Sequence, residues 1–221
     1  MSTILKRISR EIVSGHIDQT IEAVKEALQQ EIPPQEILDD GLIPAMERVG
    51  LLFQEGELFI PDVFFSAKAM HGSMDIIRPL LAPSKSMGMG RVVIGTVLGD
   101  IHDIGKRLVA TMLEGAGFTV IDLGIEVSPE AFVQAVEVHQ THIVAMSSLL
   151  TTTMMNMGAT IEALFKAGVR DQVKVLIGGA PVTRGFAEEI GADGYGSDAS
   201  TGLAEAKVLL AALKGETGGG R

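Results

Sequence analysis

The feature that most constrains the fold is a regular alternation of short apolar runs and helix-like stretches after residue 90. The runs read as buried strands, at 91–98, 118–124, 142–150, 173–179 and, more briefly, 193–196. The stretches between and after them read as helices, at 105–117, 128–139, 153–168, 182–190 and 198–213. Strands that alternate with helices form parallel sheets covered on both faces. We therefore predict a flavodoxin-like, doubly wound α/β domain with five parallel strands.

Residues 1–83 lack this alternation and are predicted to be helical. Apolar residues recur every three or four positions, as at Ile4, Ile8 and Ile12. Glycine and proline divide the stretch into four helices with short connections, which predicts a four-helix bundle. The domain organisation predicted from these patterns is a helical cap bundle at 1–83, a linker at 84–90, a Rossmann-like domain at 91–214 and a flexible tail at 215–221.

Composition excludes several classes of protein. The net charge of −10 argues against binding of nucleic acid, which requires a basic surface. The absence of cysteine excludes disulfides, Cys-ligated zinc and iron–sulfur clusters. No apolar stretch reaches membrane-spanning length, and the first residues do not resemble a secretory signal. We expect a cytoplasmic protein that binds neither nucleic acid nor membrane.

Residues 99–105, Gly-Asp-Ile-His-Asp-Ile-Gly, place a histidine between two aspartates at the turn from the first strand into the first helix. Ligands of doubly wound folds bind outside the carboxyl ends of the strands. Segments 147–152 and 178–183, which follow the third and fourth strands, fall at the same edge. This placement favours a ligand site, while a plain turn capped by Asp100 remains an alternative.

Three ligand classes fit this turn poorly. A receiver-type phosphoacceptor needs a carboxylate after the third strand, where this chain has Ser147. A dinucleotide fold needs a Gly-x-Gly-x-x-Gly turn, and this turn has only two glycines. A metal site built from several side chains needs ligands near His102, and the other four histidines are scattered along the chain.

A metal that a macrocycle already holds needs only one axial ligand from the protein. Histidine serves well when a carboxylate fixes its second ring nitrogen, and Asp100 is placed to do so. Protonation of Asp100 would then weaken the axial bond, and deprotonation would strengthen it.

Three motifs and the helical segment before them resemble the cobalamin-binding module of B12-dependent methyltransferases, including methionine synthase. The motifs are Asp100, His102 and Gly105 in the first turn, Ser147, Leu149 and Thr151 after the third strand, and Gly178–Gly179 after the fourth. Segment 56–70 resembles the bundle that covers the corrinoid in those proteins. The resemblance spans residues 1 to about 213, and is greatest to the small corrinoid carrier proteins of methylamine, methanol and methoxyl-group methyltransferase systems.

The resemblance implies a bound cobalamin or related corrinoid, such as hydroxocobalamin or methylcobalamin, in the base-off, His-on mode. His102 is the implied cobalt ligand, with Asp100 and Thr153 behind it; Thr153 stands where the methionine synthase branch has serine. The implied cofactor-binding residues are Gly99, Asp100, Ile101, His102, Asp103, Ile104, Gly105, Ser147, Leu149, Thr151, Gly178, Gly179, Ala180, Phe59 and Met70.

Local structure offers alternatives for several of these positions. Gly95, Gly99 and Gly178–Gly179 lack a Cβ that would block a cofactor tail, but the last pair also suits a tight strand-to-helix turn. Segment 147–153 also suits a strand end followed by a helix cap. Phe59 and Met70 also suit the core of the bundle, and the methionines of 154–157 are assigned to packing.

The function that the resemblance implies is a methyl carrier without turnover of its own. Its implied partners are a substrate:corrinoid methyltransferase, a second methyltransferase that serves a thiol or tetrahydrofolate, and a reductive activase. One alternative is a B12-dependent regulator, although no stretch of this sequence is left for an output domain. Another is the small cobalamin-binding subunit of a mutase, which typically lacks the helical bundle.

Overall fold

The structure of the protein is a computed structural model that describes residues 2–81 and 89–217. The chain divides into two compact units, one of residues 1–89 with 111–118 and the other of residues 90–110 with 119–221. Most of the predicted linker at 84–90 lies outside the described residues.

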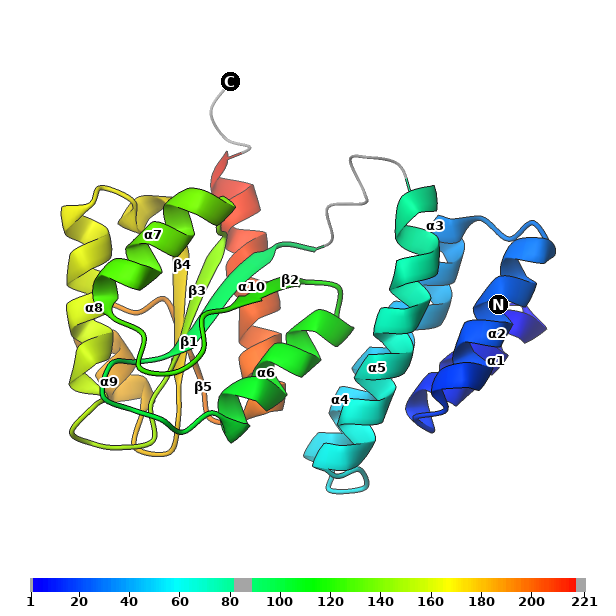
Figure 1. Ribbon diagram of the computed structural model, residues 1–221, viewed down its shortest axis with the longest axis horizontal. Helices are drawn as coiled ribbons and strands as arrows, with labels where there is room; N and C mark the ends of the chain where they lie inside the picture. The colour runs from blue at the N-terminus through cyan, green and yellow to red at the C-terminus, as the bar shows by residue number, and fades with distance from the viewer. Residues whose placement is uncertain (1, 82–88, 218–221) are drawn as a thin grey trace. The chain divides into compact units, whose positions relative to one another are not determined.

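The first unit contains the predicted helical bundle (Figure 1). Its helices are α1 (Thr3–Val13), α2 (Ile17–Gln29), α3 (Pro34–Glu36), α4 (Ile43–Gln54) and α5 (Ile60–Ile77). A π-helical turn, Ile37–Leu42, joins α3 to α4, and a short 3₁₀ turn, Arg78–Leu80, follows α5. Helix α1 packs against α2 and α4, and α5 packs against the same two helices. The third predicted helix is therefore present, but its backbone widens for one turn after α3.

The second unit contains the predicted five-stranded parallel sheet (Figure 1). Its strands are β1 (Arg91–Thr96), β2 (Thr119–Asp122), β3 (Ile143–Ser147), β4 (Lys174–Gly178) and β5 (Gly194–Gly196). They lie in the order β2-β1-β3-β4-β5, and every neighbouring pair is parallel. Because the order reverses between β1 and β3, the loops after these two strands border the crevice where such folds bind ligands.

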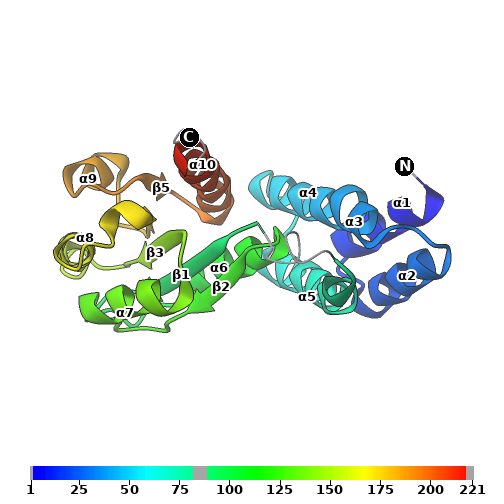
Figure 2. The ribbon, with the colours of Figure 1, turned by 90° about the horizontal axis from the view of Figure 1, so that it is seen from above.

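Helices cover both faces of the sheet, which confirms the doubly wound prediction (Figures 1 and 2). Helices α7 (Pro129–His139), α8 (Met155–Lys166) and α9 (Arg184–Glu189) lie on one face, and α6 (Ile104–Gly115) and α10 (Ala199–Thr217) lie on the other. The sheet's Val93, Val144 and Val175 are fully buried against the first group of helices. Helix α10 continues into the predicted tail as far as Thr217, and residues 218–221 lie outside the described residues.

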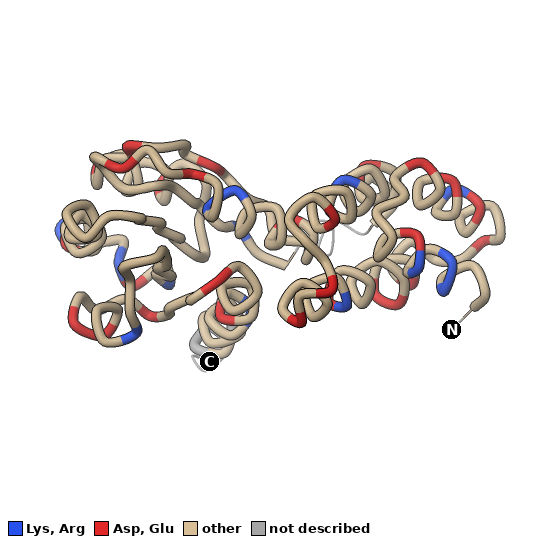
Figure 3. Tube along the Cα trace, turned by 90° about the horizontal axis from the view of Figure 1, so that it is seen from below, with Lys and Arg blue, Asp and Glu red and all other residues tan. Residues whose placement is uncertain are grey.

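Charged residues occur along both units (Figure 3). Lys and Arg are interspersed among the more numerous Asp and Glu along the described residues. Within the same residues, no helix combines the length and the hydrophobicity that a membrane crossing requires.

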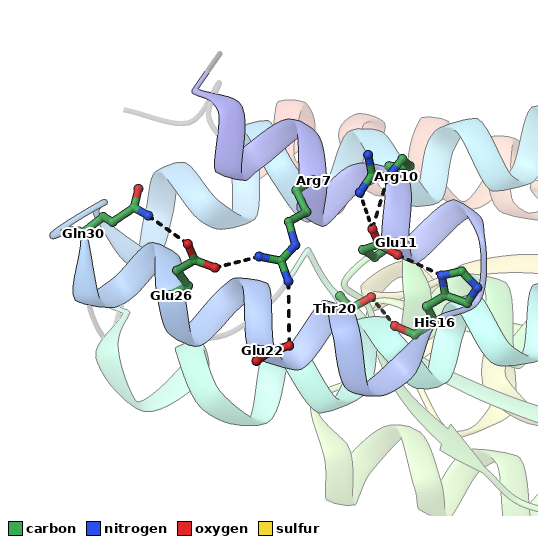
Figure 4. A network of polar contacts seen from close by, with 8 residues as sticks. All are labelled: Arg7, Arg10, Glu11, His16, Thr20, Glu22, Glu26 and Gln30. Carbon is green, nitrogen blue, oxygen red and sulfur yellow. Dashed lines mark hydrogen bonds and ion pairs between the residues drawn. The ribbon is translucent and has the colours of Figure 1, made fainter.

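A polar network ties α1 to α2 in the bundle (Figure 4). The carboxylate of Glu11 accepts a hydrogen bond from Arg10 at 2.6 Å and bonds to Nδ1 of His16 at 2.8 Å. The hydroxyl of Thr20 donates to the carbonyl of His16 at 2.7 Å. These contacts give His16 a structural role at the start of α2.

Candidate functional site

The site begins with the turn that carries β1 into α6. Gly99 adopts a φ of +80°, a conformation that L-residues with a side chain rarely adopt. The backbone N–H of Asp100 donates to the carbonyl of Val97 at 3.1 Å, which closes the turn. The turn buries Asp100 completely, while 46 % of the His102 side chain stays exposed.

One oxygen of the Asp100 carboxylate holds His102. Oδ1 accepts the backbone N–H of His102 at 3.0 Å and bonds to ring atom Nδ1 at 2.8 Å. A carboxylate on Nδ1 fixes the ring orientation and leaves Nε2 as the nitrogen for a ligand. The arrangement is therefore that of an oriented, partly exposed imidazole at the carboxyl edge of the sheet.

The other oxygen of Asp100 faces the loop after β3. Oδ2 accepts the N–H of Leu149 and the hydroxyl of Thr153, each at 2.8 Å, and lies 3.2 Å from the hydroxyl of Ser148. The hydroxyls of Ser148 and Thr153 are also 2.8 Å apart. Two loops that are distant in the sequence are thus joined through one carboxylate.

These contacts determine the charge of Asp100. Burial on its own would raise its pKa, but the hydrogen bonds from the N–H groups of His102 and Leu149, the His102 ring and Thr153 together hold the pKa well below its usual range. Asp100 is therefore an anion at neutral pH.

Ser148 is a site residue that the sequence motifs miss. The Ser-x-Leu motif begins at Ser147, which is the last residue of β3 and pairs with Thr96 and Gly178 in the sheet. Ser148 follows the strand end and is fully buried beside Asp100. Successive side chains near a strand end point to opposite sides, so two adjacent serines were a signal that only one would reach the turn after β1.

The glycines of the motifs have protein neighbours that explain most of them. A Cβ on Gly178 would lie 2.7 Å from the carbonyl oxygen of Gly196, and one on Gly179 would lie 1.8 Å from that of Ser148. A Cβ on Gly95 would meet Phe132 at 2.8 Å. Close approach of protein backbone and core packing therefore require glycine at these positions, and room for a cofactor tail there stays a prediction.

Gly105 differs from these glycines. Its φ is not positive, and a Cβ there would meet no atom within 4 Å. It lies in the first turn of α6, three residues after His102, and thus leaves open space close to the imidazole.

Several large apolar side chains are exposed on the loop that carries His102 and on the loop after β3. Ile101 and Ile104, on either side of His102 in the sequence, are 63 % and 74 % exposed. Further large apolar side chains are exposed on the same loops or at the start of α8: Leu98, Leu149, Leu150 and Met155. By contrast, the carboxylate of Asp103 bonds to Arg107 at 2.6 Å, and Thr151 and Ala180 are exposed.

This set of groups fits a metal that arrives inside a macrocycle. The loop offers one imidazole, an apolar surface and open space at Gly105. Among the described residues, no group of three or more His, Cys, Asp or Glu side chains is placed to hold a metal ion. A flat, largely apolar ring needs a single axial ligand and an apolar seat, and both are present.

The two bundle residues have different environments. Phe59, at the start of α5, is 67 % exposed, and its N–H donates to Asp62. Met70, farther along α5, is fully buried, as is Val63. Met70 therefore lies in the core of the bundle, and its side chain is not exposed to a cofactor in this structure. The side chain of Phe59 is exposed and could contact one.

Comparisons with known proteins point to the same cofactor. Two family profiles, each described as a B12 binding domain, match residues 4–78 and 90–204. The trimethylamine corrinoid protein of Methanosarcina barkeri is 45 % identical over 205 residues, which cover 91 % of this chain and 94 % of that protein. Dimethylamine corrinoid protein 3 of Methanosarcina acetivorans is 40 % identical over 207 residues, or 94 % of this chain and 97 % of that protein.

Solved structures agree in fold. A cobalamin-binding protein from Desulfitobacterium hafniense DCB-2 superposes with a TM-score of 0.77 at 31 % identity, covering 93 % of this chain and 98 % of that one. A chain of the methanol:cobalamin methyltransferase complex from Methanosarcina barkeri superposes with a TM-score of 0.83 at 27 % identity, covering 99 % of this chain and 85 % of that one. With its site and these relatives together, the chain belongs to the family of B12-binding corrinoid proteins.

Proposed function

We propose that this chain carries a methyl group on a bound corrinoid between two methyltransferases. The observation that carries the proposal is the Asp100–His102 pair, which presents one oriented imidazole on an exposed apolar surface. The cobalt of a bound corrinoid supplies the chemistry, because it can accept a methyl group from one molecule and release it to another.

The residues of this chain bind and orient the cofactor in the proposal. His102 would hold the cobalt of the corrinoid through Nε2, the ring nitrogen that Asp100 does not contact. Asp100 keeps the proton of the imidazole on Nδ1, so that Nε2 carries the lone pair. Ser148, Thr153 and the N–H of Leu149 hold Asp100 as an anion. The exposed side chains of Ile101 and Ile104 would offer the corrinoid an apolar surface.

The methyl donor in the proposal is a methylamine. Relatives named for trimethylamine and dimethylamine are 40–45 % identical over more than nine-tenths of the chain, whereas the chain of the methanol complex is 27 % identical. The proposed partners are a methylamine:corrinoid methyltransferase, a second methyltransferase that serves a thiol or tetrahydrofolate, and a reductive activase, all in the cytoplasm.

The regulator and mutase alternatives have less support. The scattered cations of Figure 3 do not favour contact with a nucleic acid. The match of residues 4–78 to a B12 binding domain and the near full-length similarity to corrinoid proteins favour a carrier over a mutase subunit.

The test is methyl acquisition in a reconstituted system. The protein is loaded with hydroxocobalamin, reduced, and incubated with a methylamine and its substrate methyltransferase, with methanol and its enzyme as a parallel reaction. We expect mass spectrometry and absorbance to show a methyl group on the bound cofactor in a methylamine reaction, and its transfer to the thiol when a thiol methyltransferase and its thiol are added. Loaded protein that acquires no methyl group from any mono-, di- or trimethylamine system would contradict the proposal.

A further inference from the structure

We propose that Thr96 is a positioning residue for the axial histidine, because its hydroxyl holds the backbone carbonyl of His102. The Thr96 Oγ1 atom donates to that carbonyl at 2.9 Å. The inference rests on the proposed function, in which His102 binds the cofactor. Thr96 contacts the carbonyl of His102, whereas Asp100 contacts its N–H and its ring.

Thr96 is itself held rigidly. It is the last residue of β1 and is fully buried. Its N–H donates to the carbonyl of Gly124 at 3.0 Å, and its carbonyl accepts the N–H of Val127 at 2.9 Å. A β-branched side chain on a backbone fixed at both ends has little rotational freedom, so Oγ1 is a fixed point of the sheet.

His102 depends on few such fixed points. Its neighbours Ile101 and Ile104 are mostly exposed and provide no packing anchor. Asp100 binds its N–H and its ring, and Thr96 binds its carbonyl. The ring and the N–H of His102 both bond to the Asp100 carboxylate. The Thr96 hydroxyl is the contact that joins the His102 carbonyl to the sheet. Loss of that hydroxyl removes the hold on the carbonyl end of His102 and leaves Asp100 as the contact that positions the ring.

A positioning role differs from a role in folding by its dependence on the imidazole. If Thr96 acts through His102, its removal matters to cofactor binding only while the imidazole is present. If Thr96 merely supports the fold, its removal matters equally with and without the imidazole. A double-mutant cycle between the two positions separates these cases.

The experiment measures binding of diaquocobinamide, a corrinoid without the nucleotide tail, whose affinity reports on the ring seat and the axial ligand. Thr96→Val removes the hydroxyl at nearly constant volume, and Thr96→Ser retains it. The matched control is Thr141→Val, which removes a buried hydroxyl that donates to the carbonyl of Ala135 near the opposite edge of the sheet.

We expect Thr96→Val to weaken cobinamide binding about fivefold, the size of effect that loss of one buried hydrogen bond produces. Thr96→Ser and Thr141→Val should stay within about twofold of wild type. In a His102→Ala background, Thr96→Val should have no further effect. An equal loss in both backgrounds, or no loss in either, overturns the proposal.

A second readout needs no cofactor. In the cofactor-free protein, Thr96→Val should speed hydrogen exchange of the His102 amide about fivefold, while amides within β1 keep their wild-type rates. Unchanged exchange at His102 refutes the role of Thr96. A wild-type protein that binds corrinoid without His102 ligation refutes the proposed function instead, and the exchange result stands apart from that outcome.

Discussion

Asp100 is a buried carboxylate whose two oxygens serve two different loops. Oδ1 holds His102, and Oδ2 is held by the loop after β3. A buried anion is tolerated only where hydrogen bonds replace the water it has lost, and here N–H groups, a ring nitrogen and hydroxyls do so. The state of the imidazole is therefore coupled to residues nearly fifty positions away in the chain.

Replacement of Asp100 by asparagine should loosen the imidazole. The amide of Asp100→Asn is uncharged, and its NH₂ group faces the Leu149 N–H or the His102 N–H without accepting from either. We expect cobalamin affinity to fall by about 10- to 100-fold, as for other partners of metal-binding histidines. Spectrophotometric titration measures the effect.

The matched control for this change is Asp103→Asn. Asp103 is the second aspartate of the motif, but its carboxylate bonds to Arg107 rather than to the imidazole. The Asp103→Asn variant should bind cobalamin with nearly wild-type affinity. Equal losses in the two variants would show that the charge of the loop matters and the contact with Nδ1 does not.

The residues of the site differ in how far sequence predicted them. Asp100 and His102 are two positions apart, so their contact is local and the motif can be recognised in the sequence. Thr153 was predicted only through the resemblance to a family. Ser148 was missed, because its contact with Asp100 depends on the position where β3 ends.

Among the elements, α10 begins with an acidic cap. The Asp198 carboxylate accepts the N–H of Thr201 at 2.8 Å and the hydroxyl of Ser197 at 3.1 Å. Burial alone would raise the pKa of Asp198, but the hydrogen bonds from Thr201, Ser197 and Ser200 lower it overall. The carboxylate thus stabilises the folded state as an anion.

Asp198→Ala should destabilise the protein by about 1 kcal/mol at pH 7 through loss of this cap. Since the folded pKa lies below the unfolded value, the contribution is complete above about pH 4–5 and is lost as the pH falls through the folded pKa. Urea unfolding at pH 7 and near pH 3.5 should show the difference from wild type shrinking. A difference that grows in acid would contradict the assignment, and Asp171→Ala, at an exposed aspartate, is the control.

The burial of Met70 in α5 leads to a prediction that separates packing from cofactor binding. Met70→Ala should cost about 2–5 kcal/mol of unfolding free energy, whereas Met70→Leu, which nearly conserves volume, should cost less than about 1.5 kcal/mol. Neither should alter the spectrum of bound cobalamin in the folded protein. A Met70→Leu variant of normal stability that failed to bind the cofactor would instead support a direct contact between Met70 and the cofactor.

Element types were predictable, and element ends were less so. Apolar periodicity located all five strands and the helices between them. The third strand, predicted over 142–150, ends at Ser147, and the helix predicted from 153 begins at Met155. Contacts with Asp100 draw residues 148–153 into a loop, which propensity along the chain does not register.

At the scale of the whole molecule, the cofactor should stabilise the chain. A ligand that binds only the folded state raises its stability by about 2.7 kcal/mol at a concentration 100 times the Kd. We therefore expect hydroxocobalamin to raise the melting temperature of the wild type, with a smaller rise for His102→Ala at the same concentration. Equal rises for both proteins would place the cofactor elsewhere.

The hydrophobic period changes after residue 90, which predicts a helical domain followed by an α/β domain. The compact units depart from this prediction at residues 111–118, which group with the first unit. The parallel orientation of the strands followed from the helices between them. The nature of the ligand did not follow from the fold, because many doubly wound domains share this topology. It came from three short motifs, all at one edge of the sheet.

The most direct test of the account is the absorption spectrum of the protein after reconstitution with hydroxocobalamin, for wild type and for His102→Ala, with the bound cobalamin counted. The account predicts one cobalamin per wild-type chain, with a base-off, His-ligated spectrum that changes in His102→Ala. A wild-type protein that retains no corrinoid, or two proteins with the same spectrum, would contradict it.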